Sequence, residues 1–246
     1  MKQLFTIAIT FFTLTVFGQQ ITSDEWDGQA KTNMRLLPKY GLQKKTEEQK
    51  QNDDKFIKET IELEMFKGDS TAASNHMISL GFTYLYRGDI KTAMYRFNQA
   101  YLLDSLNTDI YWGYGAVYMT LGNYEKAKQQ YTEGLAQSPN NTHLLTDLGT
   151  YFMAQYFPIL MMPENNFVKN PKELAQHYLD SALIYLNKSY QLDPNDQNTT
   201  FKLSTSYYYN EECDNAWKYY DECKVLGGQP ITEEYTKDLK KKCKRK

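Results

Sequence analysis

A short pair ending in Gly recurs every 34 residues through the middle of the chain. The pairs are Leu80-Gly81, Tyr114-Gly115 and Leu148-Gly149, and an aromatic residue follows each Gly by three positions, at Tyr84, Tyr118 and Phe152. A fixed period of this length predicts stacked copies of one supersecondary unit. Because one copy cannot bury its apolar face alone, such a chain gains a core only by packing each copy on the next.

A second set of residues repeats in the same register. The segments Gly88–Ala93 and Gly122–Ala127 also lie 34 residues apart. Asp89 and Asn123 are residue types that cap helices at their N-termini, so each unit should contain two helices. The small residues at the repeated positions would let those two helices approach closely.

These residues resemble the tetratricopeptide repeat, a helix-turn-helix unit of the same length. The resemblance extends from Ser74 to about Pro230. It implies an all-α, right-handed superhelical solenoid with helical caps. We expect four repeats, at residues 74–107, 108–141, 142–196 and 197–230, the third of which contains a 21-residue insertion.

The insertion lies between the two helices of the third repeat and contains the stretch FPILMMPENNFVKNP, Phe157 to Pro171. Pro158 should end the first helix at Phe157, because proline disfavours helix in the residue before it. Asn170 and Pro171 should begin a longer second helix as N-cap and first residue. The apolar ILMM run should pack on the third repeat or fold over the groove as a lid or partner-binding element; the alternative is that it only pads the longer helix.

Both ends of the solenoid need a cap. Residues 46–73 are interpreted as an N-terminal capping helix, and residues 231–246 as a C-terminal capping helix with a basic tail. Residues 19–45 have no clear period and are expected to form an extended arm, either disordered or laid along the solenoid. The basic tail has two interpretations, which are contact with an anionic membrane surface or acidic partner, and a solvated helix end.

The first 18 residues are typical of a signal peptide. One Lys is followed by an uncharged run from Leu4 to Phe17 and then by Gly18, after which cleavage is expected. This run is shorter than the roughly 20 residues that a spanning helix needs. The alternative is an uncleaved anchor. We therefore expect an exported protein, periplasmic or extracellular, with an association with the envelope as a further interpretation.

Export makes the three cysteines informative. Cys213, Cys223 and Cys243 allow one disulfide and one free thiol in an oxidising compartment. Cys213 and Cys223 lie about 15 Å apart along one helix, beyond disulfide reach. Cys213 and Cys243 are nearly equidistant from the turn at Gly227-Gly228, so they are the expected pair, and Cys223 is expected to be a buried thiol.

The sequence provides little support for catalysis or for a cofactor. His76, His143 and His177 form no metal-binding motif, and no phosphate-binding glycine loop is present. The string from Asp193 to Asn198 lacks the central Gly of a calcium loop and is better interpreted as a turn. The formal net charge of -2 gives no reason to expect nucleic acid binding. We expect a protein that is not an enzyme, with no metal and no cofactor.

Repeats of this type imply a concave groove lined by the first helix of each unit, which binds a protein or peptide partner. The expected partner-binding residues are Asn75, Phe82, Tyr86, Asp109, Trp112, Met119, His143, Asp147, Phe201, Lys202 and Tyr209 of the groove, with Ile159, Leu160, Met161 and Met162 of the insertion. Related repeats that clamp the C-terminal carboxylate of chaperones carry Lys, Asn and Arg at groove places where this chain has Ile78, Phe82, Gly113, His143 and Asp147, so a chaperone-clamp function is not expected. Two other interpretations are a structural accessory subunit of an envelope assembly and small-ligand binding under the insertion.

Overall fold

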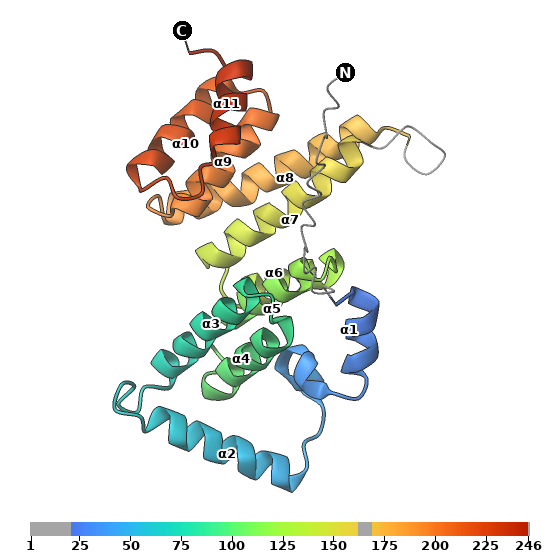
Figure 1. The fold of residues 1–246 in the computed structure, drawn as a ribbon, viewed down its shortest axis with the longest axis vertical. Helices are drawn as coiled ribbons and strands as arrows, with labels where there is room; N and C mark the ends of the chain where they lie inside the picture. The colour runs from blue at the N-terminus through green and yellow to red at the C-terminus, as the bar shows by residue number, and fades with distance from the viewer. Residues whose placement is uncertain (1–20, 162–168, 246) are drawn as a thin grey trace, which may run out of the picture.

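The computed structural model describes residues 21–161 and 169–245. Within these ranges the chain forms eleven α-helices and two short 3-10 turns, and no strand (Figure 1). The fold is therefore an all-α solenoid, as the repeat pattern predicts. None of the helices in the described ranges combines the length and the apolar character that crossing a membrane requires.

Eight helices form four successive antiparallel pairs. The pairs are α3 (Ser70–Tyr86) with α4 (Ile90–Leu103), α5 (Asp109–Thr120) with α6 (Tyr124–Gln137), α7 (Thr142–Leu160) with α8 (Pro171–Leu192), and α9 (Gln197–Tyr209) with α10 (Cys213–Val225). Figure 1 shows the pairs stacked in chain order from the green lower part to the red upper part. The first helices α3, α5, α7 and α9 come from successive repeats.

Local sequence explains where the second helices begin and how closely the pairs pack. The side chains of Asp89 and Asn123 accept hydrogen bonds from the backbone N–H three residues on, as N-caps of α4 and α6. A Cβ added at Gly115 would lie 2.1 Å from the ring of Tyr131, so this position accepts only glycine without rearrangement. The repeated glycines therefore set the distance between paired helices.

The N-terminal arm differs from the extended segment expected for residues 19–45. It begins with a helix, α1 (Ser23–Ala30), in which Trp26 is completely buried. Asp27 of α1 forms an ion pair with Lys126 of α6 at 2.7 Å. The arm is helical because burial of a large aromatic side chain against the repeats stabilises a segment that would be marginal alone.

The arm continues as two short turns, η1 (Met34–Leu36) and η2 (Pro38–Leu42), laid on α4. The buried side chain of Asn98 donates hydrogen bonds to the backbone oxygens of Arg35 and Leu37, at 2.9 and 3.0 Å. These bonds satisfy backbone groups that the irregular chain would otherwise leave without partners. The arm is thus laid along the solenoid.

The N-terminal capping helix occupies only part of residues 46–73, the segment expected to form it. Helix α2 (Glu47–Ile61) ends before Phe66, and turns connect it to α3. Phe66 is nevertheless buried, with its ring 5.4 Å from that of His76. Figure 1 shows α2 lying across the lower end of the stack, where it covers part of the first repeat.

The expectation that Pro158 ends the first helix of the third repeat is wrong. Helix α7 continues to Leu160, and the N–H of Met161 donates to the backbone oxygen of Phe157 at 3.3 Å. Proline removes only one hydrogen bond in this last turn. Ile159 packs with Tyr156 and other residues of α7 and α8, which holds the turn in place. Helix α8 then has 22 residues, against 14 in α4 and in α6.

The C-terminal helix α11 (Glu233–Lys242) folds back on α10. A disulfide joins Cys213 to Cys243, with the two Cα atoms 5.2 Å apart. Cys223 is a buried free thiol, and burial raises its pKa. The closing helix is thus fixed covalently to the start of the helix on which it packs.

Candidate functional site

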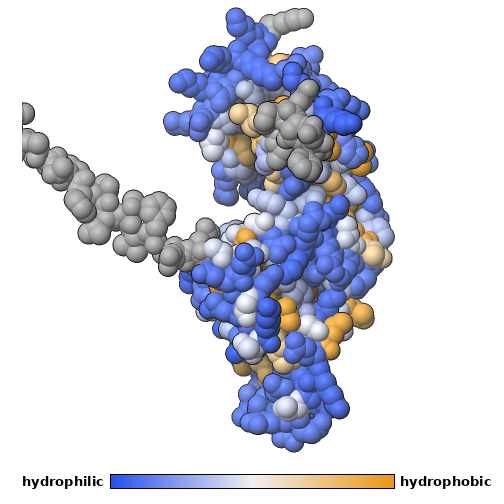
Figure 2. Space-filling view, turned by 90° about the vertical axis from the view of Figure 1, so that its right-hand side faces the viewer, coloured by the Kyte–Doolittle hydropathy of each residue, from blue (hydrophilic) through white to orange (hydrophobic). Residues whose placement is uncertain are grey.

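A hollow of about 450 Å³ lies among the first helices of all four repeats. Figure 2 shows a mostly hydrophilic surface that is hollowed on one side between the upper and lower parts of the molecule. The residues that line the hollow are Phe82, Leu85, Tyr86, Trp112, Ala116, Met119, Thr120, Tyr131, His143, Thr146, Asp147, Thr150, Asp196, Asn198 and Lys202. Its apolar wall comes from α3 and α5, and its polar wall from α7 and α9.

Four rings form a continuous stack along the apolar wall. The ring of Trp112 lies 4.0 Å from that of Phe82 on one side and 4.2 Å from that of His143 on the other. Tyr86 continues the stack beyond Phe82, with 6.0 Å between ring centroids. Phe82 is buried, whereas Tyr86 is 82% exposed. The stack therefore links three repeats and ends at the exposed ring of Tyr86.

His143 is held by an acidic residue of the preceding repeat. Its Nδ1 lies 3.2 Å from Oδ1 of Asp109, and this hydrogen bond raises the pKa of His143. Burial acts to raise the pKa of Asp109, but hydrogen bonds from His143 and Asn141 outweigh it and lower that pKa. Both charged forms are stabilised by the pairing, so the two side chains orient each other.

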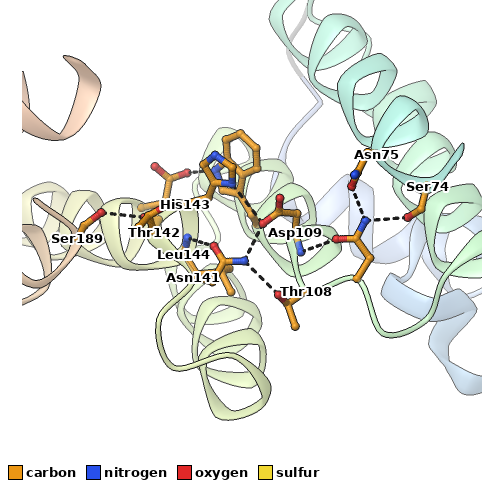
Figure 3. Close-up of polar contacts among 12 residues, drawn as sticks. Ser74, Asn75, Thr108, Asp109, Asn141, Thr142, His143, Leu144 and Ser189 are labelled. Carbon is orange, nitrogen blue, oxygen red and sulfur yellow. Dashed lines mark hydrogen bonds and ion pairs between the residues drawn. The ribbon is translucent and has the colours of Figure 1, made fainter. Parts of the chain in front are cut away.

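A hydrogen-bond pattern with the period of the repeat orders the neighbouring residues (Figure 3). Asn107 Nδ2 donates to Ser74 Oγ at 3.0 Å and to Asn75 Oδ1 at 2.7 Å. In the next repeat, Asn141 Nδ2 donates to Thr108 Oγ1 at 3.1 Å and to Asp109 Oδ1 at 2.7 Å. Each asparagine thus joins the start of one first helix to the start of the next.

Asp147 lies in the polar wall, one turn after His143. Its Oδ2 accepts a hydrogen bond of 2.8 Å from Nε1 of Trp112. Burial raises the pKa of Asp147, although Lys202 and the bond from Trp112 act in the opposite direction. The charge of this carboxylate is therefore only partly compensated in the fold.

The structure brings together part of the predicted groove. The predicted residues that line the hollow are Phe82, Tyr86, Trp112, Met119, His143, Asp147 and Lys202. Asp109 stands behind His143, and Asn75 is exposed at the Asn107 bonds. Phe201 instead packs on the ring of Tyr235, at 5.4 Å. Tyr209 packs on Phe157, at 4.8 Å.

The described residues of the insertion lie outside the hollow. Ile159 packs between α7 and α8, whereas Leu160 and Met161 are 40% and 82% exposed. Met162 lies outside the described residues. The end of α7 is thus a separate apolar surface and does not line the groove.

Several lining residues are absent from the sequence prediction. They are Leu85, Ala116, Thr120, Tyr131, Asp196 and Asn198. One of them was recognisable, because Asp196 follows Asn141 by one period plus the 21-residue insertion, and Asn141 follows Asn107 by one period. Tyr131 could not be recognised in this way, since it belongs to a second helix and reaches the hollow between two first helices. Among the described residues, no group of three His, Cys, Asp or Glu side chains could hold a metal ion.

Comparison with known proteins identifies the repeat. Residues 84–149 match the family model described as tetratricopeptide repeat. This part of the chain consists of tetratricopeptide repeats. No curated protein sequence matches the chain.

Two solved structures share the fold of this chain. The first is the thermophilic tetratricopeptide repeat protein TTC0263 from Thermus thermophilus, with a TM-score of 0.52 and 17% identity over 63% of this chain and 75% of that chain. The second is the human IFIT1 dimer with m7Gppp-AAAA, with a TM-score of 0.52 and 15% identity over 88% of this chain and 48% of that chain. At such low identity the likeness concerns the fold alone.

Proposed function

We propose that this protein is a non-enzymatic scaffold that binds a protein or peptide partner in the hollow between its first helices. Repeats of this family generally serve protein–protein interaction. Because one fold hosts many functions, the proposal must also rest on a specific site in this chain. The observation that carries the proposal is the hollow itself. It combines an aromatic wall from α3 and α5 with polar side chains from α7 and α9, so four successive repeats contribute to it. Its volume suits a few side chains of a partner.

The partner-binding role is tested with peptides selected from a display library on the wild-type protein. Tyr86→Ala should weaken binding about tenfold, because an exposed aromatic is a frequent energetic centre of interfaces. The matched control is Tyr124→Ala, since Tyr124 is also exposed, at 37%, but lies on α6 away from the hollow. Fluorescence anisotropy measures the affinities. Loss of binding in Tyr124→Ala alone would place the partner elsewhere.

The exposed end of α7 is proposed as a second contact for the same partner. Met161 is exposed and belongs to the apolar ILMM run of the insertion. Met161→Asp should weaken the selected peptides several-fold if the insertion contributes, and Asp at this exposed position should leave thermal stability unchanged. Unchanged affinity would restrict the interaction to the hollow.

We also propose that the protein acts outside the cytoplasm. The apolar run from Leu4 to Phe17 supports export, and the disulfide between Cys213 and Cys243 suits an oxidising compartment. Expression of the full chain in a secreting bacterial host should yield a mature protein that begins at Gln19. N-terminal sequencing of the exported fraction measures this, and a protein retained with Met1 in the cytoplasm would contradict it.

A further inference from the structure

The carboxylate of Asp147 lies in the hollow, and the fold compensates its charge only partly. Oδ2 accepts a hydrogen bond from Nε1 of Trp112. The hydroxyl of Tyr131 is a second partner of this carboxylate, and burial together with the carboxylate raises the pKa of Tyr131. Asp147 lines the hollow, so a ligand there can reach its carboxylate. A carboxylate that is removed from bulk water and whose charge is only partly compensated gains most from a cationic donor.

The charges around Asp147 favour a cation over an anion. Asp109 and Asp196 flank His143, and Asp196 lines the hollow with Asp147. The opposing charges are Lys202 and, when protonated, His143. No carboxylate among the described residues lies within ion-pair distance of Lys202. Two carboxylates thus line the hollow with one permanent cation, and a third carboxylate brought by a ligand would meet like charges.

The apolar wall suits the stem of a long basic side chain. Lysine and arginine carry methylene groups that bury along apolar surface while the charged end reaches a polar partner. Ala116 and Met119 lie beside the aromatic stack in this wall. Both faces of Trp112 are already covered by Phe82 and His143, whereas Tyr86 is exposed and can offer a ring face to a cation.

We infer that the hollow binds a lysine or arginine side chain of the partner, with its charged end at Asp147 and its stem against the wall of α3 and α5. This inference rests on the proposed function and specifies the chemistry of the ligand. An apolar side chain would leave the charge of Asp147 only partly compensated, and an acidic side chain would meet it as a like charge.

The inference is tested with three small probes that differ in one side chain. N-acetyl-lysine methylamide, N-acetyl-norleucine methylamide and N-acetyl-glutamate methylamide are titrated into the ¹⁵N-labelled protein. The indole N–H signal of Trp112, assigned with Trp112→Phe, reports on the site because this N–H is bonded to Asp147. The lysine probe should bind about tenfold more tightly than the norleucine probe, the size expected for one hydrogen bond to a charged group.

Three variants keep the test independent of folding. Asp147→Asn retains an acceptor for Trp112 and should make the lysine and norleucine probes equal, whereas Asp238→Asn on the exposed side of α11 should leave the preference unchanged. Lys202→Met should tighten the lysine probe several-fold, because it removes the competing cation.

The outcomes separate this inference from the proposed function. The cation site is overturned if the lysine and norleucine probes bind the wild-type protein equally, or if neither probe shifts the Trp112 signal. The proposed function is unaffected by that result, because the display-selected peptides test it separately. Tighter binding of the glutamate probe also overturns the cation site and assigns the hollow to an anion at Lys202. Loss of all peptide binding in the display experiment would overturn the proposed function itself.

Discussion

The pairing of His143 with Asp109 joins two repeats through a titratable contact. The hydrogen bond that His143 donates to Asp109 raises the pKa of His143 in the folded chain, so the contribution of this pairing to stability is fully present below the unfolded pKa of about 6.5. This contribution is lost as the pH rises through the folded pKa. The side chain of His143 is 50% exposed, so the contribution is expected to stay below about 1 kcal/mol.

Replacement of Asp109 by Asn should lower the pKa of His143. It should also reduce the amount by which the unfolding free energy at pH 5.5 exceeds that at pH 8.5, because the stabilising pairing is lost. NMR titration of the His143 ring measures the pKa, and urea unfolding at the two pH values measures stability. Asp180→Asn on the exposed side of α8 is the control. A pKa of His143 that is the same in Asp109→Asn as in the wild-type protein would contradict the pairing.

The repeated glycines also act through single contacts between paired helices. Gly115→Ala would place a methyl group 2.1 Å from Tyr131, and overpacking of this type costs about 1 to 3 kcal/mol. Gly28→Ala is the matched control, since Gly28 is also helical but has no atom within 4 Å of the added Cβ. Thermal unfolding should show a clear loss for Gly115→Ala and none for Gly28→Ala; equal effects would mean that helix propensity, and not contact, determines the result.

At the scale of elements, a buried amide joins the arm to the first two repeats. Asn98 donates to the backbone of Arg35 and Leu37, and its Oδ1 accepts from the hydroxyl of Tyr114 at 2.8 Å. The sequence contains a signal for α1 as well, because Thr22 and Glu25 form a capping box. The docking of the arm, however, requires contacts across more than 60 residues.

Asn98→Ala should therefore loosen the arm. Unsatisfied buried groups cost about 1 to 3 kcal/mol each, so we expect a loss of about 2 to 4 kcal/mol in unfolding free energy. Limited trypsin digestion should cut first at Lys31, Arg35 or Lys39. Asn215→Ala on α10, where the amide forms an exposed hydrogen bond, serves as the control. Cleavage that begins elsewhere in the chain would show that the arm has another anchor.

For the whole molecule, the buried side chains do not form one cluster. One cluster extends from α1 to α7, and three smaller ones connect α7 to α11. In a solenoid, stability is approximately the sum of terms from each repeat and its neighbours. A substitution that destabilises one end of the solenoid should therefore leave the repeats at the other end folded.

Removal of the disulfide tests this locality. The double variant Cys213→Ala with Cys243→Ala should destabilise the C-terminal end by about 2 to 4 kcal/mol, because the unfolded chain loses its cross-link. Hydrogen exchange measured by mass spectrometry should show faster exchange in α10 and α11, and unchanged exchange in α4. Cys223 is retained in both proteins. A uniform increase along the chain would mean that the solenoid unfolds as one unit.

The sequence alone determined the period, the helix pairs and their caps, because these depend on residues a few positions apart. Asp89, Asn123 and Gly115 act where the pattern places them. The tertiary structure decided which side chains meet in the hollow. Tyr131 reaches it through the stacking of repeats, and Pro158 remains in a helix because Ile159 packs on α8. Packing between distant segments adds free energy that no local pattern contains, so it can override a local preference and create a site that local spacing does not specify.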